Sequence, residues 1–234
     1  MSIYYNIAPG HYDRIFKESN GPRGKWHQYK FDTLRREMPV YTHHLDIGCA
    51  AGTFIGSLPK EKSSIGIDIA QDQIAYATET YGSDNHQFLH LAHTTSLPFD
   101  DNTFDCITAI ELIEHLAPAE NRYLTKEIHR VLQPGGCFLV TTPNYKSLWP
   151  LLELGLVHAA NETYDEQHIS RFSQEQLFSL LSAEGFINVH TVQTQGFACF
   201  LAWIHHRLAD HAHTYEHILE KRYGLLLMGK AYKQ

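Results

Sequence analysis

The chain has 234 residues, of which 43% are apolar, so it is long enough to bury one substantial core. Its 19 Lys and Arg residues are outnumbered by 26 Asp and Glu residues, which gives a formal net charge of −7. This acidic balance disfavours a broad surface for the phosphate backbone of nucleic acids. The four cysteines are far apart and form no CxxC pair, so neither a disulfide framework nor a cysteine zinc site is indicated.

Apolar runs long enough to cross a bilayer are missing from the sequence. The longest apolar run, FACFLAWI, is far too short, and the first residues do not combine a basic stretch with an apolar one. We therefore expect a cytoplasmic protein without a transmembrane segment. The apolar stretch LWPLLELGL is compatible with peripheral contact to a membrane surface.

In chain order, the first predicted elements are two amphipathic helices, HYDRIFKES and KWHQYKFDTLRREM, which cover another part of the fold. Strand-like apolar runs then alternate with segments of helical spacing. The strand-like runs are HHLDIG, SIGIDI, HQFLHL, FDCITAI and CFLVTT, and the helical segments include QDQIAYATETY and AENRYLTKEIHRVL. This alternation predicts a mainly parallel sheet with helices on both faces.

The last third of the chain predicts a helix that begins after a capping Ser173 and stops at Gly185, followed by the strand INVHTVQT. Helical material and a last apolar strand follow, and the two late strands can pair as an antiparallel edge. The expected fold is one α/β domain with a Rossmann-like, mainly parallel seven-stranded sheet. Its expected parts are N-terminal cover helices (1–40), a cofactor-binding core (42–196) with a lid at about 144–170, an inserted helical segment (197–223) and the last strand (224–234).

A glycine-containing turn, CAAG, connects the first predicted core strand to a helix that begins near Thr53. In a parallel sheet this turn lies at the carboxyl edge, where ligands bind. Gly48 and Gly52 let the backbone approach a ligand closely, and the helix N-terminus offers unpaired N–H groups. Ala50 stands where a middle glycine would be more permissive. Its methyl group is tolerated at a negative φ and would cost about 1 kcal/mol at a positive one.

Two aspartates accompany this turn. Asp68, in GIDIA, ends the second strand, where a carboxylate can accept hydrogen bonds from both hydroxyls of a ribose. Asp46 suits a cationic ligand better than a pyrophosphate, and the GxGxxG pattern of dinucleotide sites is missing. A nucleoside that carries a sulfonium and an amino group fits both features. In the alternative, structural interpretation, the glycines only make a tight turn and Asp68 caps the next helix.

With these motifs the chain resembles the class I S-adenosylmethionine-dependent methyltransferases, small-molecule type, from about residue 44 to residue 232. The motifs that carry the resemblance are LDIGCAAG, GIDIA, SLPFDDNTFDCITAIELIEHL and EIHRVLQPGGCFLVTTPN. It implies S-adenosyl-L-methionine as the cofactor. The cofactor-binding residues it implies are Asp46, Gly48 and Gly52 at the methionine part, Asp68 at the ribose, and Ala50, Ile69, His93, Thr94 and Ile110 around the rest of the ligand.

Ala50 and His93 depart from the family pattern. His93 stands where many relatives have an Asp that accepts a hydrogen bond from the adenine amino group, and a neutral imidazole can accept one through a single nitrogen. We expect these departures to alter cofactor affinity and to leave the fold intact.

The segment ELIEHL follows the fourth strand. On a helix, Glu111, Glu114 and His115 would share one face, and His168 could reach the same edge of the sheet. Carboxylates and imidazoles suit a divalent ion, and the set resembles the ExxEH segment of two metal-assisted branches, the ubiquinone-biosynthesis O-methyltransferases and the small-RNA 3′-terminal 2′-O-methyltransferases. Glu111, Glu114, His115 and His168 would then be metal ligands. Alternatively the glutamates are solvated or cap a helix, and His115 or His168 removes a hydroxyl proton as a catalytic base.

Aromatic residues gather outside the predicted central strands, in the N-terminal helices, in residues 144–168 and in the late helical segment. This distribution favours a pocket for a small apolar or aromatic acceptor, and the imidazoles favour O-methylation. RNA is a less favoured acceptor because no basic cluster lies near the lid. A third hypothesis is a non-catalytic protein that binds the cofactor, in which Ala50 and His93 mark the loss of activity.

Overall fold

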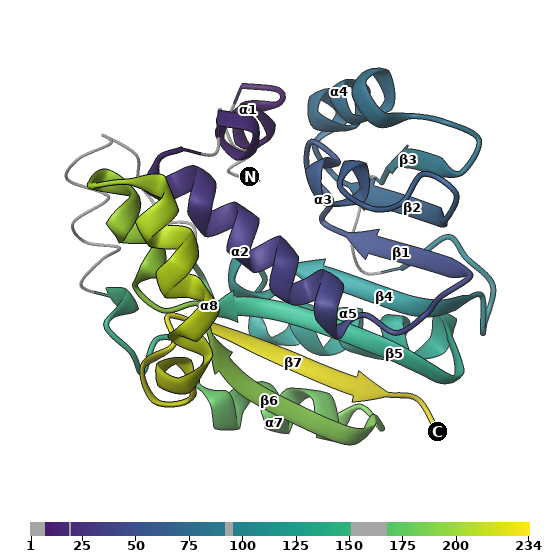
Figure 1. Cartoon of the computed structure of the whole chain (residues 1–234). Coiled ribbons are helices and arrows are strands. Elements are labelled where there is room, and N and C mark those ends of the chain that lie inside the picture. Colours follow the sequence, from purple (N-terminus) through teal and green to yellow (C-terminus); the bar gives the residue numbers. More distant parts are fainter. Residues whose placement is uncertain (1–7, 19, 92–95, 151–167) are drawn as a thin grey trace.

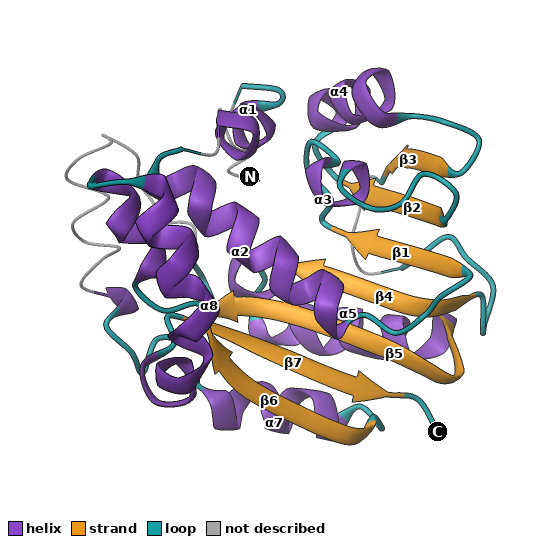
Figure 2. Cartoon of the chain, in the orientation of Figure 1, coloured by secondary structure: helices purple, strands orange, loops and turns teal. Residues whose placement is uncertain are grey.

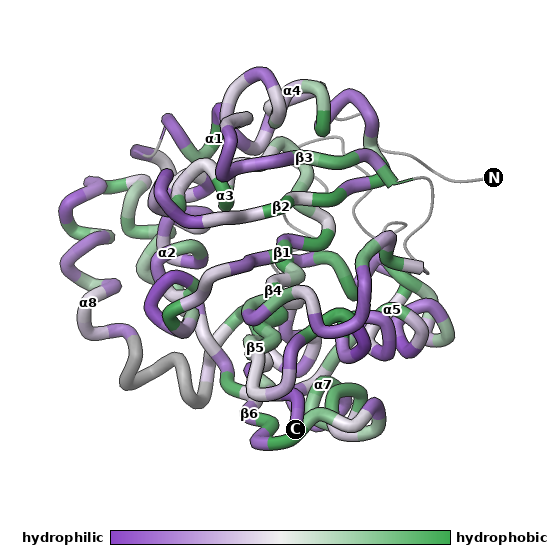
Figure 3. The backbone as a smooth tube through the Cα atoms, turned by 90° about the vertical axis from the view of Figure 1, so that its right-hand side faces the viewer, coloured by the Kyte–Doolittle hydropathy of each residue, from purple (hydrophilic) through white to green (hydrophobic). Residues whose placement is uncertain are grey.

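The computed structural model describes residues 8–18, 20–91, 96–150 and 168–234, and for residues 217–222 it describes the backbone. The described residues form a seven-stranded sheet in the order β3-β2-β1-β4-β5-β7-β6 (Figure 1). Figure 3, turned by 90°, shows β3 at the top and β6 at the bottom of this sheet. The strands are β1 (His43–Ile47), β2 (Ser63–Asp68), β3 (His86–His90), β4 (Phe104–Ile110), β5 (Leu132–Pro143), β6 (Ile187–Thr194) and β7 (Leu226–Tyr232).

Pairing between strands confirms the mainly parallel sheet that the sequence predicts. Strand β7 is antiparallel to both of its neighbours, β5 and β6, and the other pairs are parallel. The antiparallel strand therefore lies one place in from the edge, and β6 forms the edge itself.

Helices lie on both faces of the sheet, as expected (Figure 2). They are α1 (His11–Glu18), α2 (Pro22–Glu37), α3 (Thr53–Gly56), α4 (Gln71–Tyr81), α5 (Pro118–Val131), α7 (Gln174–Ala183) and α8 (His206–Tyr223), with 3₁₀ turns η1 (Ile113–His115) and η3 (Ala198–Trp203). The cap of α7 is the one the sequence predicts, because the Ser173 hydroxyl accepts a hydrogen bond from the Gln176 N–H at 3.2 Å. None of the described helices has both the length and the apolar character that crossing a bilayer requires.

Two of the apolar clusters hold α2, α3, α5 and α7 to the sheet. One joins α5 and α7 to the central strands through residues such as Leu124 and Leu177, and the other joins α2 and α3 through Leu34 and Phe54. Side chains alternate between the faces of a strand, so Leu45 in β1 belongs to the first cluster. His44 and Asp46 are buried on the opposite face of β1, where the His44 ring lies near the ring of Phe54.

Helix α1 connects the two halves of the carboxyl edge. Its fully buried Asp13 carboxylate accepts hydrogen bonds from the hydroxyls of Tyr76, at 2.8 Å, and Tyr81, both on α4. On its other side, Phe16 packs against Phe31 of α2, with ring centroids 5.3 Å apart. Figure 1 accordingly shows α1 between α2 and α4.

Helix α2 also contacts the late helical segment. The Asp210 carboxylate of α8 accepts hydrogen bonds from Lys25, at 2.6 Å, and from Tyr29, at 3.0 Å. The Tyr29 ring stacks on His213 of α8 with centroids 3.8 Å apart. The predicted N-terminal and late cover elements therefore form one connected layer.

Replacing Asp13 by Ala should release α1 from α4, because two partly buried tyrosine hydroxyls lose their acceptor. We expect a loss of about 1–3 kcal/mol, which corresponds to roughly 5- to 150-fold faster amide hydrogen exchange in α1. Hydrogen exchange with mass spectrometry measures this change. Asp32→Ala is the control, because Asp32 on α2 forms an exposed ion pair with Arg35. Unchanged exchange in α1 of Asp13→Ala would contradict the docking role.

Candidate functional site

The predicted cofactor turn lies at the carboxyl ends of β1 and β2. The N–H groups of Gly48 and Cys49 both donate to the Ile67 carbonyl, at 2.9 and 3.0 Å, which holds the turn against the end of β2. Gly48 and Gly52 have φ values of 74° and 71°, a region that favours glycine. A Cβ atom at Gly52 would lie 2.6 Å from the Phe88 ring, so the close packing of this turn also requires glycine there.

Ala50 has a φ of 44°, so the turn has the positive value at which a methyl group is unfavourable. Its N–H donates to the Asp68 carboxylate at 2.8 Å. This charge-assisted hydrogen bond offsets part of the strain.

Asp68 ends β2, as the sequence predicts, and its carboxylate bridges two backbone segments. It accepts from Ala50 at 2.8 Å and, through its other oxygen, from Ala70 at 2.8 Å. Burial raises the pKa of Asp68, while these backbone hydrogen bonds act in the opposite direction. A carboxylate offers about four lone-pair positions, so two remain for ribose hydroxyls.

The other predicted cofactor residues take different places. Asp46 is buried on β1, and burial raises its pKa to about 7 although the Thr108 hydroxyl donates to it. Ile69 directly follows Asp68, and Ile110 ends β4 beside the apolar cluster of α2 and α3. His93 and Thr94 lie outside the described residues.

The helix expected over ELIEHL is wrong. Only Ile113–His115 form a 3₁₀ turn, and Glu111 has a φ of 50°, which no helix residue adopts. Glu111 instead forms an ion pair with Lys30, which α2 places over the carboxyl end of β4. Burial would raise the pKa of Glu111, but the charges of Lys30 and His27 bring it below its usual value. The Glu111 carboxylate is therefore occupied by a tertiary ion pair and is not one of the three residues whose ligand atoms come together.

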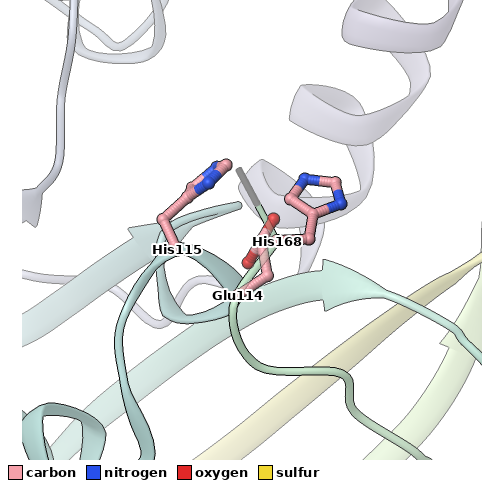
Figure 4. Close-up of side chains that lie close together, drawn as sticks. All are labelled: Glu114, His115 and His168. Atoms are coloured by element: carbon pink, nitrogen blue, oxygen red, sulfur yellow. The ribbon is translucent and has the colours of Figure 1, made fainter. Parts of the chain in front are cut away.

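Glu114, His115 and His168 do come together, and each offers one possible ligand atom within 4.8 Å of the others. Figure 4 shows the Glu114 carboxylate beside the two imidazole rings. Ser170 fastens the two segments, because its N–H donates to the Glu114 carbonyl at 2.9 Å. This contact explains how residues 53 positions apart in the chain share a site.

Glu114 is the buried acid of this cluster, and its pKa is raised. Its side chain is buried, and the Oε2 atom has no hydrogen-bond partner among the described residues. Burial, together with the nearby charge of Glu111, raises the pKa of Glu114 to about 8. A carboxylate in this position is stabilised by a proton or by a cation that replaces it.

Tyr145 is a site residue that the sequence analysis missed. Its hydroxyl lies 2.6 Å from His168 Nδ1, and the Arg171 guanidinium lies 5.3 Å from the centre of its ring. The bridge between Asn144 and Phe172 aligns the end of β5 with this segment. The available signal was position alone, because Tyr145 comes two residues after the end of a strand at the ligand-binding edge.

Aromatic residues of the cover layer lie at the same edge. Trp26 of α2 packs against Trp149, with ring centroids 5.5 Å apart. Trp203, by contrast, is 76% exposed on η3. Most of the predicted lid, residues 151–167, lies outside the described part of the chain, as does most of LWPLLELGL.

The sequence is similar to a methyltransferase domain family and to several curated methyltransferases. Residues 45–140 match the methyltransferase domain family model. The chain is 28% identical over 214 residues to a demethylmenaquinone methyltransferase of Lactiplantibacillus plantarum, covering 81% of this chain and 88% of that protein. It is 29% identical over 156 residues to the cycloartenol-C-24-methyltransferase of Arabidopsis thaliana, covering 59% of this chain. The chain spans 45% of the length of that relative.

The fold is shared with solved structures. One is a SAM-dependent methyltransferase from Thermotoga maritima, described as a possible histamine N-methyltransferase. It superposes with a TM-score of 0.66 at 18% identity and covers 96% of this chain and 95% of its own. This structure confirms the fold, while the methyltransferase domain match and the curated relatives support the family resemblance inferred from LDIGCAAG and GIDIA.

Replacing Ala50 by Gly should remove the strain at a φ of 44°. We expect the free energy of unfolding to rise by up to about 1 kcal/mol, with cofactor affinity retained or improved. Thermal denaturation and calorimetry with S-adenosylhomocysteine measure the two effects. Ala51→Gly in the same turn is the matched control, because Ala51 does not have a positive φ. A large loss of affinity in Ala50→Gly would show that the methyl group itself contacts the ligand.

Proposed function

Because the chain belongs to the class I S-adenosylmethionine-dependent methyltransferases, we propose that it transfers the methyl group of this cofactor to the hydroxyl oxygen of a small apolar or aromatic acceptor. The observation that carries the proposal is the pair His115 and His168, whose rings lie 5.0 Å apart at the carboxyl edge. An imidazole there can remove the proton that an oxygen acceptor must lose. The sulfonium itself supplies the activated methyl group.

Cofactor binding is assigned to the turn and the two aspartates. Gly48, Ala50 and Gly52 bring the backbone close to the methionine part, Asp68 receives the ribose hydroxyls, and Asp46 faces the cationic end. Ile69, Ile110, His93 and Thr94 complete the set by resemblance. The described geometry supports the first five, because they all lie around the joined ends of β1 and β2.

His168 is the better placed of the two candidate bases, because its hydrogen bond with Tyr145 holds the imidazole ring in one orientation. When Nδ1 carries the proton and donates to the Tyr145 oxygen, Nε2 carries the lone pair that a base needs. The opposite tautomer would place a proton on Nε2 and prevent catalysis. Tyr145 is therefore a positioning residue in this proposal.

A divalent ion is the alternative for the same cluster. Glu114, His115 and His168 provide one carboxylate and two imidazoles, and the buried Glu114 Oε2 without a partner fits an ion that would neutralise it. Bound there, the ion would lower the pKa of an acceptor hydroxyl. Glu111 does not fit this set, because Lys30 already pairs with it.

The acceptor is assigned from the cover layer and from the relatives. Tyr145 lies against His168, and Trp26 packs against Trp149 in the cover layer; we assign these rings to the wall of the acceptor pocket. The demethylmenaquinone methyltransferase, which matches most of this chain, favours a quinone-like ring as acceptor. Its name also supports a second candidate, methylation of a ring carbon, because loss of a phenolic proton activates the ring as well as the oxygen. The acidic surface disfavours RNA.

The direct test is methyl transfer from labelled S-adenosylmethionine to a panel of phenols, quinols and isoprenoid-linked quinols. We expect an organic-soluble product whose NMR spectrum shows an O–CH₃ group. A C–CH₃ product would establish the second candidate and refute O-methylation. Labelling of an RNA, with none of these small acceptors, would refute the small-molecule assignment altogether.

The roles of Tyr145 and of a metal are separated by two treatments. Tyr145→Phe should lower kcat by roughly 10- to 100-fold, with S-adenosylhomocysteine affinity unchanged, because the imidazole of His168 loses the hydrogen bond that holds its ring in place. Tyr123→Phe is the control, because Tyr123 is an exposed tyrosine on α5.

The metal alternative is tested by chelation. Activity should persist after dialysis against EDTA. Loss of activity in EDTA, restored by Mg²⁺, would replace the base with the metal.

A further inference from the structure

We propose that His44, acting through Thr108, positions Asp46 for the amino group of the cofactor, and that this buried row makes the protein selective for ligands that carry the amino-acid part. The inference rests on the proposed placement of Asp46 at the methionine part. His44 and Thr108 are positioning residues, since neither needs to touch the ligand.

The row is continuous across the three central strands. The Thr108 hydroxyl, on β4, lies 2.6 Å from Asp46 Oδ1, and His44 Nε2, on β1, lies 2.9 Å from the same hydroxyl. His44 Nδ1 lies 3.2 Å from the Ser64 hydroxyl on β2. His44, Ser64 and Thr108 are fully buried and Asp46 is 2% exposed, so water cannot replace any member of the row.

The direction of every hydrogen bond in the row follows from counting protons. An ionised Asp46 can only accept, so the single hydroxyl proton of Thr108 points to it. The Thr108 oxygen then accepts from His44, which must carry its proton on Nε2. His44 is neutral because burial lowers its pKa to about 3, so its Nδ1 accepts the proton of Ser64. All donors therefore point towards Asp46.

This alignment has two consequences for Asp46. Its Oδ1 atom is fixed by Thr108, which sets the orientation of the carboxylate and leaves Oδ2 for a ligand. Each hydrogen bond polarises the next, so the row stabilises the ionised form of a buried acid. A bound ammonium group supplies the remaining stabilisation. Without the row, the carboxylate could rotate or stay protonated, and the ammonium group would lose a charged partner.

The alternative hypothesis, that the row has only a structural role, predicts a different result. If the four residues only satisfied one another inside the sheet, breaking the row would weaken the fold, and every ligand of the site would lose affinity equally. A positioning role instead weakens only those ligands that contact Asp46. Ligand discrimination therefore separates the two roles.

The experiment measures, by calorimetry on the full chain, the affinities of S-adenosylhomocysteine, decarboxylated S-adenosylmethionine and 5′-methylthioadenosine. The first two carry the amino group, and the third lacks the whole amino-acid part. Thr108→Val keeps the shape and removes the hydroxyl. We expect it to weaken the first two by 10-fold or more and 5′-methylthioadenosine by less than 3-fold. Thr108→Ser should restore the affinities, and Thr125→Val, a buried Thr→Val change on α5, should alter none of them.

Equal loss for all three ligands in folded Thr108→Val would overturn the proposal in favour of a structural role. His44→Leu gives the same comparison if Thr108→Val does not fold, and we expect a smaller loss, about 3- to 10-fold, for the amino-bearing ligands only. Asp46→Asn tests the underlying assignment. If Asp46→Asn fails to discriminate among the ligands, Asp46 does not face the amino group. If Asp46→Asn discriminates and Thr108→Val does not, the assignment stands and the row has no positioning role.

Discussion

The Asp68 carboxylate is the contact on which the carboxyl edge depends. Its two oxygens accept N–H groups from Ala50 and Ala70, which belong to the connections after two different strands. Strands β1 and β2 are parallel neighbours, so their ends meet and one carboxylate can reach both connections. The turn at Ala50 keeps its positive φ because this charged acceptor stabilises it. In the proposed function, the ribose would bind to a carboxylate that already supports the loop around it.

The proposed acceptor side differs from the cofactor turn, because cover helices such as α1 and α2, and not the central strands, supply its contacts. Lys30 of α2 reaches Glu111 at the end of β4, and Asp13 of α1 reaches two tyrosines of α4. These are buried polar contacts, which are costly when a partner is lost, so they specify one position for the cover layer. Because α1 contacts both α2 and α4, the acceptor cover and the cofactor half are coupled through that helix.

The sequence predicted those features whose conformation depends on residues that are close together in the chain. The turn in LDIGCAAG, the carboxylate at the end of β2 and the Ser173 cap each depend on a few neighbouring residues and on strand order. The helix over ELIEHL failed because Glu111 pairs with Lys30, 81 positions earlier, and that partner lies outside any local pattern. Tyr145 was missed for the same reason, since its role appears only when Asn144 bridges to Phe172.

Three acids at this edge, Glu111, Asp46 and Glu114, have different pKa values because their partners differ. Glu111 has Lys30 and stays ionised, while burial raises the pKa of Asp46 to about 7 and that of Glu114 to about 8. Asp46 and Glu114 are therefore partly protonated near neutral pH when no cation is bound, and a bound cation favours their charged form. In the proposed function, that cation is the ammonium group of the cofactor at Asp46, and at Glu114 it is a proton or an ion on the acceptor side. Under that proposal, cation binding and charge development are coupled on both sides of the reacting methyl group.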